Sequence, residues 1–198
     1  MEKNYTWQHW NDPQLLNTAT IHLHNDHLTA TGTQTCDRYS ASWSLTTTPR
    51  WVTQHVSVEV TGASWARSLE LQRSTEGIWA HDTSMTGRQP TDWPEPGIAP
   101  GTDLSAALDC DLGLCPVTNT MPILRLGLME GHVSRTRLIM AWIDIPTLRV
   151  IASDQYYASA DSTSVSYASG TRQVNVNLGV DSDGIVTDYP QLARRLED

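Results

Sequence analysis

The sequence predicts a single, mainly β domain, and three observations support this prediction. Several segments alternate between apolar and polar residues, which is the period of a strand with one buried face. Turn-forming residues recur roughly every 8–12 residues, a spacing typical of a sandwich, roll or barrel. The chain of 198 residues is long enough for one core, because folding at this size buries roughly 70% of the extended surface. We therefore expect one domain spanning residues 1–198.

Two segments show the alternation most clearly. In the first, Val52, Val56, Val58 and Val60 are separated by polar residues such as Ser57 and Glu59. The second has the apolar phase Val174, Val176, Leu178 and Val180. Weaker alternation covers residues 19–23, 39–45, 65–71 and 165–167, and turns are expected near residues 25–26, 61–62, 76–77, 130–131 and 183–184. All of these segments are predicted to be half-buried strands.

Two further segments do not follow the strand pattern. Residues 86–101 contain four prolines and three glycines, so we expect neither a paired strand nor a helix there, and interpret the segment as a lid or edge cover. Residues 188–196 look helical instead. Asp188 can cap the helix, Pro190 suits its first turn, and Arg194 and Arg195 lie near the C-terminal end of the dipole.

The charge balance argues against several classes of partner. A net charge of −9 and a pI near 5.1 disfavour nucleic acid and anionic membrane surfaces, because both attract clustered basic residues. No apolar run approaches the ~18 residues of a membrane-spanning helix, and residues 1–7 lack the apolar core of a secretory signal. Three cysteines do not outline a disulfide framework, which favours the cytoplasm.

The aromatic residues are unusual, with eight Trp, six Tyr and no Phe. Every large aromatic side chain therefore carries an N–H or O–H group that needs a partner where it is buried. Such side chains suit the wall of a ligand cavity, and they equally suit a core whose rim meets water.

A histidine cluster is the one candidate for a metal site. His22 and His24 share a strand face, and His27 follows the turn. The spacing matches no established metal motif, so we interpret these residues as surface histidines and expect no metal. Residues 181–184 resemble the start of a calcium loop, but Leu192 replaces its final glutamate, which favours a hairpin turn. No cofactor-binding motif occurs in the sequence.

Asp109 and Asp111 are the strongest candidates for catalysis. As residues i and i+2 of a strand they share one face at a separation of ~7 Å. Glycosidases use paired carboxyl groups at about this separation, one with a raised pKa. Hydrogen bonding of the two carboxylates to an arginine or to backbone N–H groups is the structural alternative.

The segment around residues 109–126 has an unusual composition. We expect a strand ending at Pro116, a turn at residues 118–120 and a second strand that starts at Pro122 and carries Arg125. A guanidinium group in an apolar strand needs an anionic partner. That partner is either Asp109 or Asp111, or the phosphate, carboxylate or polyhydroxyl head group of a ligand.

Several runs in this half of the chain resemble a known family. Residues 108–112 and 116–126 resemble the central signature of the bacterial putative glycolipid-binding family, and residues 142–150, 155–157 and 180–190 follow in the same order. The N-terminal half agrees more loosely, through Trp51 and residues 77–79. Val117 stands where the family usually has an aromatic residue, which predicts a differently shaped pocket.

The resemblance implies a spiral β-roll, in which a long, curved antiparallel sheet wraps around a helix. This fold is similar to that of bacterial lipoprotein carriers, whose apolar interior accepts acyl chains. The resemblance also implies a homodimer, and it supplies no catalytic residue.

The leading hypothesis is therefore a cytoplasmic domain that binds a glycolipid or a similar lipid in its concave interior, without a cofactor and without altering the ligand. The polar candidates for ligand contact are Arg125, Asn119, Gln155 and Tyr156, and the candidates for the cavity wall are Trp142 and Tyr167. Two alternatives stay open. One is a glycan- or lipid-directed hydrolase that uses Asp109 and Asp111, and the other is a structural domain that binds a protein partner.

Overall fold

The computed structural model describes residues 2–197 and contains one 15-stranded sheet in this part of the chain. The strands of its first half are β1 (Glu2–His9), β2 (Leu16–Leu23), β3 (Leu28–Cys36), β4 (Tyr39–Thr48), β5 (Val52–Gly62), β6 (Trp65–Arg73) and β7 (Trp79–Gly87). Those of the second half are β8 (Gly97–Ile98), β9 (Ala107–Leu112), β10 (Thr136–Ile143), β11 (Arg149–Asp161), β12 (Ser164–Ser169), β13 (Val174–Val180), β14 (Val186–Tyr189) and β15 (Ala193–Arg195). The helical elements are η1 (Pro49–Trp51), η2 (Pro116–Asn119) and α1 (Thr120–Arg125).

The two halves of the sheet are joined where the ends of the chain meet. Strands β1 to β7 form an antiparallel meander, and β15 pairs with β1 on one side and with β14 on the other. The sheet then continues through β13, β12, β11 and β10 to β9. Two pairings are parallel, β9 with β10 and β8 with β11, and all the others are antiparallel.

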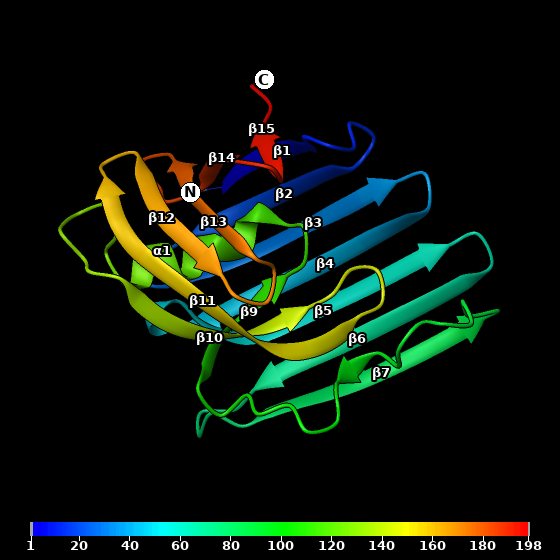
Figure 1. Cartoon of the computed structure of the whole chain (residues 1–198). Coiled ribbons are helices and arrows are strands. Elements are labelled where there is room, and N and C mark those ends of the chain that lie inside the picture. The colour runs from blue at the N-terminus through cyan, green and yellow to red at the C-terminus, as the bar shows by residue number, and fades with distance from the viewer. Residues whose placement is uncertain (1, 198) are drawn as a thin grey trace.

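The sheet curls so that its second half lies over its first half, with the helical segment between them (Figure 1). The last strand in the sheet order, β9, reaches across the interior to β5, where the Cys110 N–H donates a 2.9 Å hydrogen bond to the Thr53 hydroxyl. This arrangement confirms the predicted fold class, a long curved sheet wrapped around a helix. Within residues 2–197 no helix has the length and apolar character needed to span a membrane.

The strands that were predicted from alternation are all present. In β5 the side chains of Val56, Val58 and Val60 are completely buried, whereas Ser57 and Glu59 point to the opposite face. One face of the meander therefore packs on the core and the other meets solvent, as expected for antiparallel strands.

The predicted strand at Pro122 is wrong, and so is the turn before it. Residues 116–119 form the 3-10 helix η2 and residues 120–125 form α1. Pro116 occupies the first turn of η2, where the missing N–H is tolerated, and Pro122 similarly lies in the first turn of α1. Prolines that were interpreted as strand boundaries therefore mark helix starts.

The predicted C-terminal helix is also wrong. Residues 186–189 and 193–195 form β14 and β15, separated by a turn in which Gln191 has a φ of 68°. The Trp10 N–H donates to the Leu192 carbonyl and the Leu196 N–H donates to the Thr6 carbonyl. Pairing with β1 thus overrides the local helix signals.

Residues 86–101 are mostly irregular, but the expectation that they contain no paired strand is wrong at both ends. Thr86 and Gly87 finish β7, and β8 pairs in parallel with β11. Gly97 also lets β8 approach β7 closely, because a Cβ at this position would lie 2.5 Å from the ring of His81 on β7.

Candidate functional site

The helical segment η2–α1 holds several of the predicted site residues inside the roll. Every residue from Pro116 to Ile123 is buried, and Met121 and Ile123 are among the largest fully buried side chains. The chain itself therefore fills the concave interior that was predicted to accept a ligand.

Arg125, at the end of α1, forms a bidentate ion pair with Asp109 of β9. Its Nη1 donates to Asp109 Oδ1 at 2.6 Å and its Nη2 donates to Oδ2 at 2.5 Å. The Asp109 side chain is completely buried and that of Arg125 is 11% exposed. Burial raises the pKa of Asp109 above its ordinary value, and Arg125 opposes this shift. The prediction that Asp109 or Asp111 pairs with Arg125 is confirmed for Asp109.

Asn119 and Gln155 belong to a buried network around Asp111. The Asp111 carboxylate accepts a 2.8 Å hydrogen bond from the Thr118 hydroxyl and a 2.6 Å bond from Gln155 Nε2. The Tyr157 hydroxyl lies 2.9 Å from Asn119 Oδ1 and 3.0 Å from Gln155 Oε1, and both oxygens are acceptors. This network is satisfied by the chain itself, so it links η2 to β9 and β11 without a ligand.

The three predicted aromatic residues lie in different surroundings. Tyr167 is buried, and its ring packs edge-on against those of Tyr157 and Tyr189 at 5.1 and 5.6 Å. Trp142 is half-buried on β10. Tyr156 points to the opposite face of β11 from Tyr157, where the guanidinium of Arg135 covers its ring at 4.5 Å. The structure thus brings Asn119 and Gln155 together and keeps Tyr156 apart, and ligand contact by the six residues stays a prediction.

The paired carboxylates lie on one face of β9, as predicted, but neither is free. Both oxygens of Asp109 accept from Arg125, and the two oxygens of Asp111 accept from Thr118 and Gln155. Burial raises the pKa of Asp111 as well. A hydrolytic pair needs carboxyl groups that are open to the substrate and to water. These contacts disfavour the hydrolase alternative.

The predicted surface histidines form ordinary surface contacts. His22 Nε2 lies 3.2 Å from a Glu2 carboxylate oxygen, and the His24 and His27 rings stack at 4.3 Å. Among residues 2–197 no group of three or more His, Cys, Asp or Glu residues could hold a metal ion.

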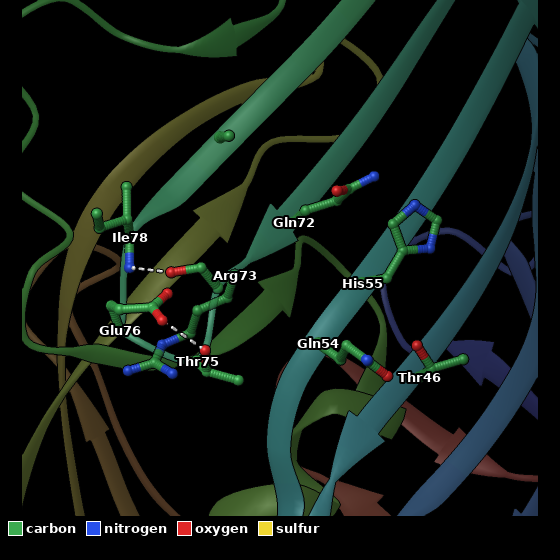
Figure 2. Close-up of a pocket in the computed structure, with 10 residues that line it drawn as sticks. Thr46, Gln54, His55, Gln72, Arg73, Thr75, Glu76 and Ile78 are labelled. Atoms are coloured by element: carbon green, nitrogen blue, oxygen red, sulfur yellow. Dashed lines mark hydrogen bonds between the residues drawn. The ribbon is translucent and has the colours of Figure 1, made fainter.

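A polar groove opens beside the hairpin that joins β6 to β7, with a volume of about 740 Å³. It is lined by Thr46, Gln54, His55, Gln72, Arg73, Ser74, Thr75, Glu76, Ile78 and Ala80. Figure 2 shows two groups of side chains that face each other, with Thr46, Gln54, His55 and Gln72 on one side and Arg73, Thr75, Glu76 and Ile78 on the other. Eight of the ten lining residues can form hydrogen bonds through their side chains.

The hairpin side of the polar groove is held in place by hydrogen bonds. Arg73 Nε donates to the Ala107 carbonyl at 3.0 Å, and the Ile78 N–H donates to the Ser74 hydroxyl at 3.2 Å. On the strand side, Gln54 and Gln72 are exposed, and their amide groups have no hydrogen-bond partner within residues 2–197. These amides are available to a ligand.

An apolar groove of about 260 Å³ adjoins the polar groove. It is lined by Gly77, Ile78, Trp79, Ile98, Thr102, Leu104 and Ser105. Ile78 lines both grooves, and its side chain is 67% exposed, the largest exposure of any bulky apolar residue described. A ligand that covered Ile78 would therefore contact a hydrogen-bonding surface on one side and an apolar surface on the other.

Comparisons with known proteins identify the family. The sequence matches the family described as "Putative glycolipid-binding" over residues 4–195. The chain belongs to this family.

A solved crystal structure shows a similar fold. It is a DUF1089 family protein from Pseudomonas aeruginosa, which superposes with a TM-score of 0.69 at 24% sequence identity over 91% of this chain and 92% of that chain. No curated protein matches the sequence.

The groove residues of this putative glycolipid-binding family member were not predicted from the sequence. They come from β4, β5, β6, the β6–β7 hairpin, β7, β8 and the segment before β9, which only the fold brings together. One local signal was present, because an isoleucine directly follows the Glu76–Gly77 turn, where polar residues are usual.

Proposed function

We propose that the protein binds an amphipathic ligand of the glycolipid type at the polar and apolar grooves, and that it does not alter this ligand chemically. The observation that carries the proposal is the exposed Ile78, which lies on the boundary between the two grooves. The family to which the chain belongs supports the same class of ligand.

The polar groove suits a polyhydroxyl head group. Its volume of about 740 Å³ falls within the range of ~300–1,000 Å³ that is usual for small-molecule sites. The amides of Gln54 and Gln72 can each donate to and accept from sugar hydroxyls, and Arg73 and Glu76 add one charged donor and one charged acceptor. Because charges of both signs line the groove, a neutral sugar suits it better than a strongly ionic head group.

The apolar groove suits the first part of an acyl chain. Ile78, Trp79, Ile98 and Leu104 provide its apolar wall, and each buried methylene contributes about 0.8 kcal/mol. The concave interior was the predicted place for the chain, but η2 and α1 occupy it with fully buried side chains such as Val117 and Met121. We therefore assign the acyl chain to the surface groove.

The six residues that were predicted to contact the ligand take a different part in this proposal. Asn119, Gln155, Trp142 and Tyr167 support the roll that positions the grooves. Arg125 and Tyr156 line two other surface pockets, of about 300 and 70 Å³. We further infer a reducing compartment such as the cytoplasm, because Cys36, Cys110 and Cys115 are all free thiols.

The test uses a neutral alkyl glycoside, dodecyl maltoside, below its micelle concentration, with binding measured by titration calorimetry. We expect Ile78→Glu to weaken binding about tenfold, which corresponds to about 1.4 kcal/mol, because it places a charge against the alkyl chain. Gln72→Ala should weaken binding of dodecyl maltoside but not of dodecanoate, which has the chain without the sugar.

A matched control is Leu196→Glu, which makes the same kind of change at another exposed apolar residue that lines neither groove. This variant should bind as the wild type does. The proposal is rejected if the wild type does not bind dodecyl maltoside, or if Ile78→Glu and Leu196→Glu bind it equally well.

A further inference from the structure

Another cavity, which we call the Arg125 pocket, opens beside the last strand in the sheet order, β9. It has a volume of about 300 Å³ and is lined by Ala106, Leu108, Asp109, Arg125, Arg137, Leu138 and Ile139. None of these residues lines the polar groove or the apolar groove. The Arg125 pocket is therefore separate from the site that we propose for the amphipathic ligand.

Arg125 uses only part of its hydrogen-bonding capacity on Asp109. A guanidinium group has five N–H groups. Two of them donate to the Asp109 carboxylate from Nη1 and Nη2, and a third donates from Nη1 to the Trp51 carbonyl at 3.5 Å. The Nε–H group and the second N–H of Nη2 have no acceptor within residues 2–197. These two groups share one edge of the planar guanidinium, and such an edge can bind a second carboxylate through two parallel hydrogen bonds.

This unused edge of Arg125 reaches solvent. Arg125 Nε is not among the fully buried side-chain atoms without a partner in residues 2–197. Because Nε has no partner either, it retains contact with solvent. The side chain is 11% exposed and lines the pocket. Asp109 holds the guanidinium from its other edge, so the two free donors are oriented before any ligand binds.

The backbone of β9 is irregular at this pocket. Ala107 pairs with Ile139 and Asp109 pairs with Met140, so between these pairs β9 has one residue more than β10. The additional residue is Leu108, which the β-bulge leaves out of the ladder. Bulges are rare between parallel strands and are common beside active sites. Here the bulge places half-buried Leu108 in the lining, where it forms an apolar wall with Ile139.

The charges of the lining favour an anion. Two arginines and one aspartate give the lining a net charge of +1, in a chain whose net charge is −9. Arg137 pairs with Asp154, which does not line the pocket, and their side chains are 59% and 40% exposed. Such an exposed pair contributes little to stability, so Arg137 can turn to an anion at small cost. One negative charge balances the lining, whereas a phosphate dianion would leave surplus negative charge beside the buried carboxylate.

We propose that the Arg125 pocket binds a small monocarboxylate with an apolar tail. The carboxylate accepts hydrogen bonds from the free edge of Arg125 and from Arg137. The tail packs on Leu108, Leu138 and Ile139. The tail is short, because the volume of the pocket is at the lower end of the range of ~300–1,000 Å³ that is usual for small-molecule sites. This site does not depend on the binding of a glycolipid, so the two proposals fail independently.

The test uses hexanoate, titrated into nitrogen-15-labelled protein and followed by nuclear magnetic resonance. We expect saturable shifts of the backbone amide signals of residues 106–109 and 137–139. Two related compounds separate the charge from the tail: hexan-1-ol has the chain without the carboxylate, and acetate has the carboxylate with a single methyl group. Each should bind at least about tenfold more weakly than hexanoate, because it lacks one of the two contacts.

Ala106 allows the charge of the pocket to be changed without touching the pair between Arg125 and Asp109. It is exposed and lines the pocket. Ala106→Glu should weaken hexanoate binding about threefold and Ala106→Lys should strengthen it about threefold, because one exposed charge has a modest effect. Arg137→Gln should also weaken binding about threefold. Its matched control is Arg149→Gln at an exposed arginine outside the pocket, which should bind hexanoate as the wild type does.

Four results would overturn the proposal. Hexanoate might cause no saturable shift at residues 106–109, or hexan-1-ol or acetate might bind as tightly as hexanoate. Ala106→Glu and Ala106→Lys might bind with equal affinity, or Arg137→Gln and Arg149→Gln might do so. Gln72→Ala, in the polar groove, should leave hexanoate binding unchanged. A loss of binding in this variant equal to that in Arg137→Gln would assign hexanoate to the polar groove and would likewise contradict the proposal.

Discussion

The ion pair between Arg125 and Asp109 is the most deeply buried ion pair within residues 2–197. A carboxylate with no exposed surface is stable in its charged form only with a matched partner, and the bidentate geometry at 2.5 and 2.6 Å supplies one. Removing one member of such a pair leaves an uncompensated buried charge, which costs about 3–5 kcal/mol. Asp109 also borders a pocket of about 300 Å³, so water can reach the neighbourhood of the pair.

We therefore predict that Arg125→Met lowers the free energy of unfolding by about 3–5 kcal/mol at neutral pH, measured by urea denaturation. The pKa of Asp109 is already raised above its ordinary value of 3.8 by burial, and the loss of Arg125 raises it further. Between 3.8 and this raised pKa the folded state binds more protons than the unfolded state, so stability falls as the pH rises through this window. The defect of Arg125→Met should accordingly shrink as the pH is lowered towards 3.8.

The control for this prediction is the double variant Asp109→Asn/Arg125→Met, which removes both charges. It should be more stable than Arg125→Met at neutral pH and should show little of the added pH dependence. If Arg125→Met lowers the free energy of unfolding by less than about 1 kcal/mol, the pair behaves as an exposed ion pair, contrary to its burial.

At the scale of elements, the segment between β7 and β8 is anchored at its centre. Arg67 on β6 is buried, and its Nη1 donates to the carbonyls of Pro94 at 2.6 Å and Thr147 at 2.9 Å. Its guanidinium also lies 5.0 Å from the ring of Trp93, which packs edge-on against Trp65 at 4.8 Å. These contacts support the interpretation of the segment as a cover and argue against a freely moving lid.

Replacing Arg67 should release this cover while the strands persist. Arg67→Met leaves two carbonyls without their donor, and each unsatisfied buried group costs about 1–3 kcal/mol. We expect faster amide hydrogen exchange in residues 88–96 and unchanged exchange in β3 and β4. Exposed Arg149 gives a control, since Arg149→Met should leave residues 88–96 protected. Equal protection of residues 88–96 from hydrogen exchange in Arg67→Met and Arg149→Met would show that other contacts hold the segment.

The strands could be predicted from the sequence better than the short helical segments. The alternation in β5 and β13 predicted both strands and the face of each that packs on the core. The errors lay at residues 116–125 and 188–196, where short segments with capping or proline signals take their structure from distant partners. The need of Arg125 for an acidic partner could be predicted, because it follows from a guanidinium group in an apolar segment. The grooves around Ile78 could not be predicted, because only the fold brings their residues together.

At the scale of the whole molecule, one seam joins the two halves of the sheet. Strand β15 has only three residues, yet it pairs with β1 on one side and β14 on the other. Two backbone bonds give the phase of this ladder: the Trp10 N–H donates to the Leu192 carbonyl, and the Leu196 N–H donates to the Thr6 carbonyl. Because hydrogen-bonded pairs alternate in an antiparallel ladder, the N–H of Arg194 faces Gln8 of β1. The ion pair between Arg195 and Asp181 at 2.5 Å and the pair between Lys3 and Asp183 lie beside this seam.

Arg194 allows the backbone of the seam to be tested separately from its side chains. The Arg194 side chain is exposed and lies 4.8 Å from the Trp10 ring, so Arg194→Ala should cost no more than about 1 kcal/mol. Arg194→Pro removes in addition the N–H that faces β1 in the interior of the sheet, and should cost about 3 kcal/mol or more. Urea denaturation of both variants measures the difference. Because the wild-type sheet is continuous, we expect the wild type and Arg194→Ala each to unfold in a single transition. The urea midpoint of Arg194→Pro should lie well below the midpoints of both. Equal midpoints for the two variants would mean that the packing around η2 and α1, rather than the β1–β15 ladder, holds the roll together.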